Sequence, residues 1–121
     1  MKLSKKIGLL ALSLVLTFTS SAFAEEIFYN IPKSSFKKYV WVKNEKYFKN
    51  PSIVCLDVET DSAIYIQYWD SDDNFDSSPL LVGSSWQCHQ PRKNGKYRIK
   101  LVNANPNTTV KLTGGEIFYD K

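Results

Sequence analysis

The chain has 121 residues, of which 43% are hydrophobic and 23% are charged, and its formal net charge is +4. Lys2, Lys5 and Lys6 belong to the first 24 residues, so residues 25–121 hold thirteen basic and twelve acidic side chains. This near-neutral balance argues against a general binder of nucleic acid or of anionic membranes, because such proteins keep a strong positive excess. Ninety-seven residues are enough for one domain with a modest core.

The first 24 residues have the three parts of a bacterial-type secretory signal. A lysine-rich start precedes an apolar run over 7–18, and Ala22, Phe23 and Ala24 form a small-x-small cleavage motif. An uncleaved anchor helix is the alternative, but a spanning helix needs about 20 mainly apolar residues and this run is shorter. We therefore expect cleavage after Ala24. The product, residues 25–121, is then expected in the periplasm or the external medium, without a membrane anchor.

β-Branched and aromatic residues that alternate in character predict strands along most of residues 25–121. Turn residues separate these segments: Asn94-Gly95 predicts a hairpin, and Asn105 to Asn107 and Gly114-Gly115 predict two further reversals in an antiparallel meander. No window has a capped helical period. We predict an all-β domain, a small antiparallel two-sheet β-sandwich, with a small β-barrel as the alternative. The predicted strands are 27–31, 36–43, 53–59, 63–70, 80–82, 86–90, 96–103, 108–113 and 116–119.

The same alternation predicts which side chains face the core, because neighbouring residues of a strand point to opposite faces of its sheet. The expected core side chains are aliphatic, with two tyrosines. They are Val40, Val42, Val54, Leu56, Val58, Ile64, Ile66, Tyr68, Tyr97, Ile99, Leu101, Val110 and Leu112.

Four aromatic residues are left on the face opposite to these core residues. Tyr39 and Trp41 share one predicted strand, and Tyr65 and Trp69 share another with Gln67 between them. Rings mixed with polar side chains provide apolar surfaces for stacking and groups that orient a ligand. The sequence therefore predicts that these four residues bind a sugar or a peptide. The alternative is that the rings are packed under loops or inside a thick core.

Cys55 and Cys88 are the two cysteines of the chain. Outside the cytoplasm an even pair indicates a disulfide, and closing a loop of this length stabilises a fold by about 3–4 kcal/mol. Cys55 is expected beside Asp57 on the outer face, so the bond should hold a loop or an edge of the sheet. With His89 as the single histidine and no pattern of further ligands, neither a metal site nor a cofactor is expected.

Charge is distributed unevenly along the chain. Residues 33–49 are rich in lysine, residues 57–76 are acidic and residues 92–111 are basic again. These segments either neutralise one another on the surface or form a bipolar surface that orients a charged partner. The segment Asp70–Asp76 resembles the start of a calcium loop, but Phe75 and Leu81 occupy the places where a helix-loop-helix site needs glycine and glutamate. An acidic solvated turn and a weak extracellular Ca²⁺ site both remain open.

Motifs that carry catalysis are missing from the sequence. It contains no Gly-x-Ser-x-Gly motif, no phosphate loop and no histidine-rich pattern, so we expect a protein that is not an enzyme. We expect it to act by binding a secreted or envelope protein, in an inhibitor or immunity-like role. A cell-wall or other glycan-binding role and a secreted antimicrobial or toxin-like role are the alternatives. The sequence leaves the oligomeric state open.

Overall fold

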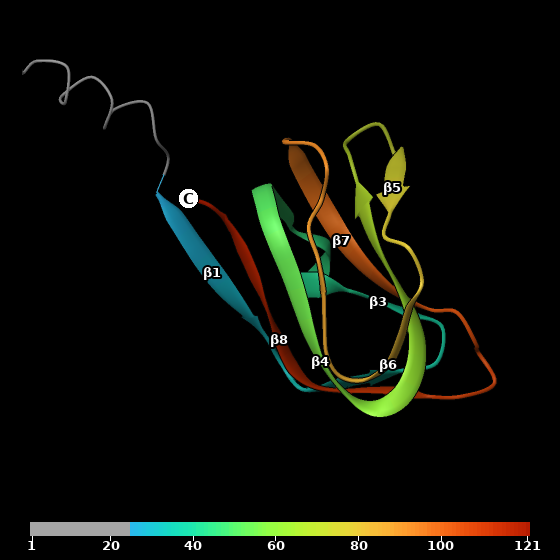
Figure 1. Ribbon diagram of the computed structural model, residues 1–121. Coiled ribbons are helices and arrows are strands. Elements are labelled where there is room, and N and C mark those ends of the chain that lie inside the picture. The colour runs from blue at the N-terminus through green and yellow to red at the C-terminus, as the bar shows by residue number, and fades with distance from the viewer. Residues whose placement is uncertain (1–24) are drawn as a thin grey trace, which may run out of the picture.

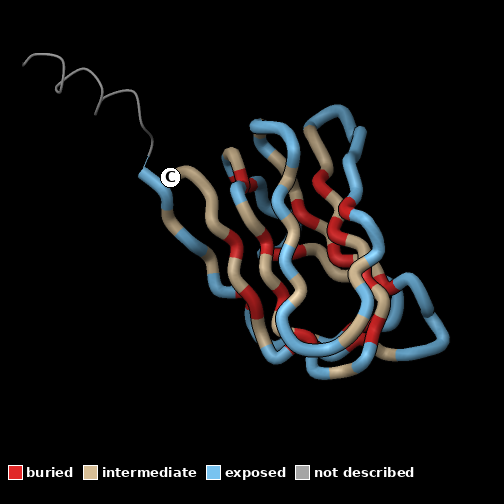
Figure 2. The backbone as a smooth tube through the Cα atoms, viewed as in Figure 1, coloured by how far each residue is buried: buried red, intermediate tan, exposed pale blue. Residues whose placement is uncertain are grey.

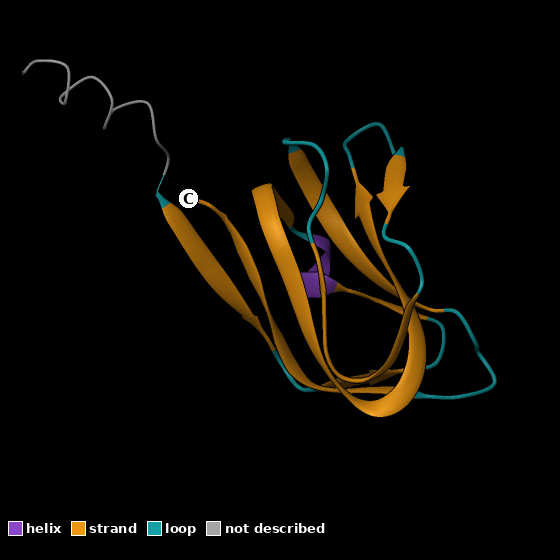
Figure 3. Ribbon diagram, in the orientation of Figure 1, coloured by secondary structure: helices purple, strands orange, loops and turns teal. Residues whose placement is uncertain are grey.

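The computed structural model describes residues 25–121, and the predicted signal segment with its cleavage site lies outside the described residues. The described part is built from strands with one short 3₁₀ turn (Figure 3). The predicted all-β class is therefore confirmed. In chain order the elements are β1 (Glu26–Ile31), β2 (Ser34–Phe36), β3 (Tyr39–Trp41), η1 (Val42–Glu45), β4 (Tyr47–Trp69), β5 (Phe75–Ser77), β6 (Leu81–His89), β7 (Lys96–Asn103) and β8 (Val110–Asp120). Within residues 25–121, no helix is long and apolar enough to cross a membrane.

A single bent strand, β4, organises the molecule. It is 23 residues long and its pairing shifts between Val58 and Ser62, where Figure 1 shows the ribbon curving back on itself. β8 pairs with the first half of β4, β7 pairs with the second half, and β5 and β6 follow β4 along its other side. β1 and β2 pair with β8, and β3 pairs with β7. The bend in β4 thus turns one sheet into two facing layers.

All eight strands belong to one hydrogen-bonded sheet, so the expected division into two separate sheets is not observed. The start of β4 also pairs with β7, with Tyr47 opposite Arg98 and Phe48 opposite Tyr97. Arg98 is paired with Trp69 at the far end of β4 as well. The beginning of β7 therefore links both ends of β4 and holds the curled sheet closed at that end.

The core lies between the facing layers, as the buried segments in Figure 2 show. The inward faces predicted for 53–59 and 63–70 are confirmed, since Val54, Leu56 and Ile66 have no exposed surface and Tyr68 is only 2% exposed. Val40 and Tyr97 are partly buried and pack against this core. Phe48 and Ile117 were not among the predicted core residues, yet both are almost fully buried.

Several predicted strand boundaries were wrong because tertiary pairing overrides local turn signals. The segments 53–59 and 63–70 form one strand, and 80–82 and 86–90 are joined in β6. Segment 36–43 is instead divided among β2, β3 and η1, because the chain changes its pairing partner from β8 to β7 within it.

The predicted meander at the carboxyl end is also wrong. β7 and β8 each pair with β4, and neither pairs with the other in the described part of the chain. Asn94-Gly95 does not form a β-hairpin: Gly95 exchanges hydrogen bonds with Asn50, whose backbone N–H reaches the Gly95 carbonyl at 2.7 Å. Gly114 and Gly115 lie inside β8. A Cβ on Gly115 would approach the Cys55 carbonyl oxygen to 2.5 Å, so glycine there permits close strand packing instead of a reversal.

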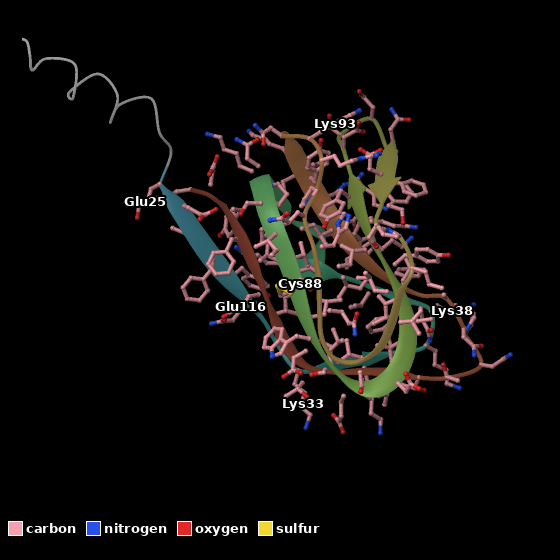
Figure 4. The ribbon with its side chains drawn as sticks, in the orientation of Figure 1. Glu25, Lys33, Lys38, Cys88, Lys93 and Glu116 are labelled. Carbon is pink, nitrogen blue, oxygen red and sulfur yellow. A yellow bond between two sulfur atoms is a disulfide. The ribbon has the colours of Figure 1, made fainter. Side chains whose placement is uncertain are left out.

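The predicted disulfide between Cys55 and Cys88 is present. The two cysteines lie directly opposite each other on β4 and β6, with their Cα atoms 4.1 Å apart. Figure 4 shows the sulfur atoms near the label of Cys88, beside β4. Among the described strands β6 pairs only with β4, so the bond attaches an edge strand to the central strand, as expected.

Candidate functional site

One outer face of the sheet gathers six large aromatic side chains around two cations. We call it the aromatic face. Strands β3, β5 and β7 contribute to it, together with both ends of β4. On β7 the aromatic face is the side opposite to the core side chains Ile99 and Leu101. Its members are Tyr39, Trp41, Tyr47, Tyr65, Gln67, Trp69, Phe75, Arg98, Lys100 and Val102.

Strand register arranges these residues in three rows that cross β7. In the first row Val102 is paired with Tyr39 and with Tyr65. In the second row Lys100 is paired with Trp41 and with Gln67. The rows bring together aromatic residues that are far apart in sequence, because β7 lies between β3 and the second half of β4.

The third row is centred on Arg98. It is paired with Tyr47 and with Trp69, and Trp69 is paired in turn with Phe75 of β5. Arg98 therefore lies between aromatic neighbours on both sides, whereas Lys100 has Trp41 on one side and Gln67 on the other. Such cross-strand neighbours are close enough for their side chains to interact.

The rings contact one another directly. The centroids of Trp41 and Trp69 are 5.9 Å apart in an edge-to-face arrangement, and Phe75 stacks on Trp69 at 4.5 Å. Gln67 accepts a 3.0 Å hydrogen bond from Nε1 of Trp69, which fixes that indole. Tyr39 is 50% exposed and Phe75 is 48% exposed, so these rings offer apolar surface to a ligand.

The structure places the four aromatic residues predicted from the sequence on this one face. Tyr39 is exposed, and Trp41, Tyr65 and Trp69 are half-buried. Of these, Trp41 and Trp69 are in direct ring contact.

Sequence reasoning missed Tyr47 and Phe75 as members of the face. Tyr47 precedes the predicted strand 53–59, and Phe75 lies in the acidic segment Asp70–Asp76. Neither belonged to a predicted strand, so alternation could not assign its side chain to a face. Arg98 and Lys100 alternate with Ile99 and Leu101, and this spacing was the available signal for their position.

Arg98 is held by charge and by rings. Its guanidinium donates hydrogen bonds to Glu45 at 2.9 Å, to Asp73 at 2.6 Å and to the Asp70 carbonyl at 2.9 Å. It also lies over the ring of Trp41, at 5.4 Å from the centroid. The hydrogen bond to Asp73 is the largest influence that raises the pKa of Arg98, so the side chain stays charged. Arg98 thus ties η1 and the β4–β5 turn to the aromatic face.

Lys100 is surrounded by rings instead of carboxylates. Its Nζ lies 4.2 Å from the ring centroid of Tyr39, 5.2 Å from that of Trp41 and 5.3 Å from that of Trp69. Ring faces carry negative partial charge, so this position stabilises the ammonium group without neutralising it.

The acidic segment after β4 acts as a turn. Asp70 accepts hydrogen bonds from the backbone N–H groups of Asp72 and Asn74 through Oδ1. Asp73 is occupied by its ion pair with Arg98. Within residues 25–121, no group of three or more His, Cys, Asp or Glu side chains is arranged to hold a metal ion.

The single histidine belongs to a different part of the molecule, at the end of β6. His89 Nδ1 shares a 2.9 Å hydrogen bond with the hydroxyl of Tyr68, and burial raises the pKa of that hydroxyl. Burial and the positive charge of Arg92 lower the pKa of His89. The pair connects the edge strand to the core.

Comparison with known proteins gives no family for this chain. No model of a known protein family matches it, and no curated protein matches its sequence.

Proposed function

We propose that this chain is an extracytoplasmic binding protein whose aromatic face contacts a secreted or envelope protein, in an inhibitor or immunity-like role. The observation that carries the proposal is the cluster of exposed and half-buried rings around Arg98 and Lys100. Tyrosine, tryptophan and arginine dominate the energetic centres of protein interfaces, because they present large and rigid contact surfaces. The disulfide and the predicted signal segment support a location outside the cytoplasm.

The arrangement of the rings favours a protein partner over a glycan. Sugar stacking needs open ring faces, but Phe75 stacks on Trp69 and the ammonium of Lys100 lies over Tyr39, Trp41 and Trp69. These contacts occupy ring surface that a sugar would need. They also immobilise the side chains before binding, which lowers the entropy that association costs.

The experiment is a pull-down from envelope and culture-medium fractions of the source organism, with the full chain purified after export. Trp69→Ala and Tyr39→Ala are compared with Trp86→Ala. Trp86 is a matched control because it is 53% exposed on β6 and is paired with Asp57, outside the strand segments that form the aromatic face. We expect one protein to be retained by the wild type and by Trp86→Ala, and to be lost with the two face variants.

The dissociation constant for that protein should rise about tenfold or more in the face variants. Unchanged thermal unfolding would show that each variant is folded. An equal loss with Trp86→Ala would place the contact elsewhere. Binding on a glycan array with no retained protein would contradict the protein partner and support the glycan role.

A further inference from the structure

Lys100 differs from Arg98, the other cation of the aromatic face, because no acidic side chain of residues 25–121 is paired with it. Its amine lies over three rings, and the side chain is half-buried in the middle row of the face. We infer that Lys100 receives a carboxylate from an acidic side chain of the partner protein. This inference rests on the proposed function and specifies the chemistry of the partner at this face.

The first argument is the unbalanced charge. Within residues 25–121, no carboxylate oxygen lies within the 4.0 Å ion-pair limit of the Lys100 amine. Gln67, its cross-strand neighbour on β4, directs its side-chain oxygen to the indole N–H of Trp69. A positive charge without a carboxylate partner in residues 25–121 therefore remains among the rings of the aromatic face.

The second argument is the contrast with Arg98, two residues earlier on the same strand. The Arg98 guanidinium already donates to Glu45, to Asp73 and to a backbone carbonyl. It is committed to holding the face together and has two negative partners of its own. Of the two cations on β7 in this face, Lys100 is the one left to pair with a ligand.

The third argument is the setting of the amine. The side chain is half-buried and three rings lie beside its amine, so pairing with a carboxylate costs less further desolvation than at an exposed lysine. A partner that covers the face would exclude the remaining water and strengthen the attraction, because charges interact more strongly in a lower dielectric. The rings would pack against the aliphatic part of the same acidic side chain.

Charge at the Tyr39 end of the aromatic face also favours an acidic partner, whereas the acidic segment lies beside Arg98 at the other end. Lys37 and Lys38 lie in the connection between β2 and β3, directly before Tyr39, and both are exposed. The connection is held in place because Asn103, beside Val102 on β7, hydrogen-bonds the carbonyls of both lysines. Figure 4 shows Lys38 at the periphery of the molecule. These lysines would attract an acidic surface during approach.

The test uses the full exported chain and a displayed library of random linear peptides as the probe. Selected peptides are measured by the change in tryptophan fluorescence against wild type, Lys100→Met, Lys100→Arg and Lys111→Met. Lys100→Met keeps the aliphatic packing and removes the charge, and Lys100→Arg restores the charge. Lys111 is an exposed lysine on β8 and serves as the matched control.

We expect the selected peptides to be rich in Asp and Glu and their affinity to fall with added salt. It should fall about tenfold or more in Lys100→Met, recover in part in Lys100→Arg and stay unchanged in Lys111→Met. Replacing the acidic residue of a selected peptide by its amide should lower the affinity for wild type as much as Lys100→Met does. The same peptide change should leave the affinity for Lys100→Met unchanged. Equal losses that do not add are the signature of a direct pair.

Three results would overturn the inference. Peptides that need Trp69 but neither Lys100 nor an acidic residue would overturn it and leave the proposed function standing. A library with no binder that depends on the aromatic face would count against both. Binding of polygalacturonate through Lys100, without any peptide binder, would assign the amine to an acidic glycan instead of a protein.

Discussion

Arg98 on β7 donates a 2.9 Å hydrogen bond to Glu45. Glu45 is the last residue of a turn whose backbone conformation is unfavourable for residues other than glycine. Lys43, Asn44 and Glu45 have φ values of 53°, 54° and 67°, so three consecutive non-glycine residues are left-handed. This conformation is unfavourable for L-residues because it brings Cβ close to the following carbonyl oxygen. The contacts of Arg98 with Glu45 and of Lys43 with the ring of Tyr29, at 5.2 Å, hold the turn in place.

The left-handed turn predicts a strong dependence on residue type at Asn44. Valine there should lower the free energy of unfolding by about 1–2 kcal/mol, because a β-branched residue fits this backbone poorly. Lys46→Val is the control, since Lys46 is exposed and extended with φ of −78°. Urea unfolding of both variants measures the difference. Equal midpoints would show that the turn is not left-handed in solution.

Two adjacent glycines of β8 should respond differently to alanine. Gly115→Ala brings Cβ against the Cys55 carbonyl oxygen, whereas Gly114→Ala meets its nearest atom, the Ile31 carbonyl oxygen, at 3.3 Å. We expect Gly115→Ala to lower the free energy of unfolding by about 1–3 kcal/mol and Gly114→Ala to have the smaller effect. Thermal unfolding monitored by circular dichroism ranks the two. The reverse order would contradict the packing of β8 against β4.

The disulfide should be a large part of the stability of this small domain. It joins residues 33 positions apart, and losing such a link costs about 3–4 kcal/mol by the chain-entropy argument. The Cys55→Ala, Cys88→Ala double variant should therefore unfold at a lower urea concentration than the oxidised protein. Reductant should shift the wild type to the same midpoint and leave the variant unchanged. Free thiols in freshly exported protein would argue against the bond.

His89 should make stability depend on pH. Its pKa in the folded chain lies below the ordinary 6.5, mainly because of burial and also because of Arg92, so the unfolded chain binds more protons between those two values. The free energy of unfolding should therefore fall as the pH drops below 6.5 and level off below the folded pKa. His89→Gln, which stays neutral, should lose this part of the pH dependence. Parallel stability curves for both proteins would refute the assignment.

Lys37 is expected to influence the rate of association with the partner protein more than the rate of dissociation. It is exposed at the rim of the aromatic face, where a charge steers an approaching partner without being buried by it. Lys37→Ala should slow association with the protein retained by the aromatic face and flatten its dependence on ionic strength. Surface plasmon resonance at several salt concentrations separates the two rates. A change confined to the dissociation rate would place Lys37 inside the contact.

Local pattern in the sequence was enough to predict the strand content, the inward faces and the disulfide. Alternation predicted Val54, Leu56 and Ile66 correctly because a residue's face depends only on its neighbours along the strand. The export signal and the even cysteine count predicted the pairing of Cys55 with Cys88, which the structure contains. The shared outward parity of Trp41 and Trp69 was visible for the same local reason.

Strand partners were decided only by the tertiary structure. The glycine pair at 114–115 is typical of a reversal, but β8 continues through it because close packing against β4 requires a residue without a side chain at 115. Tyr47 and Phe75 join the aromatic face because β4 curls until both of its ends lie beside Arg98. Such proximity depends on which distant segments share hydrogen bonds and a common core. A pattern read along one strand contains no information about that choice.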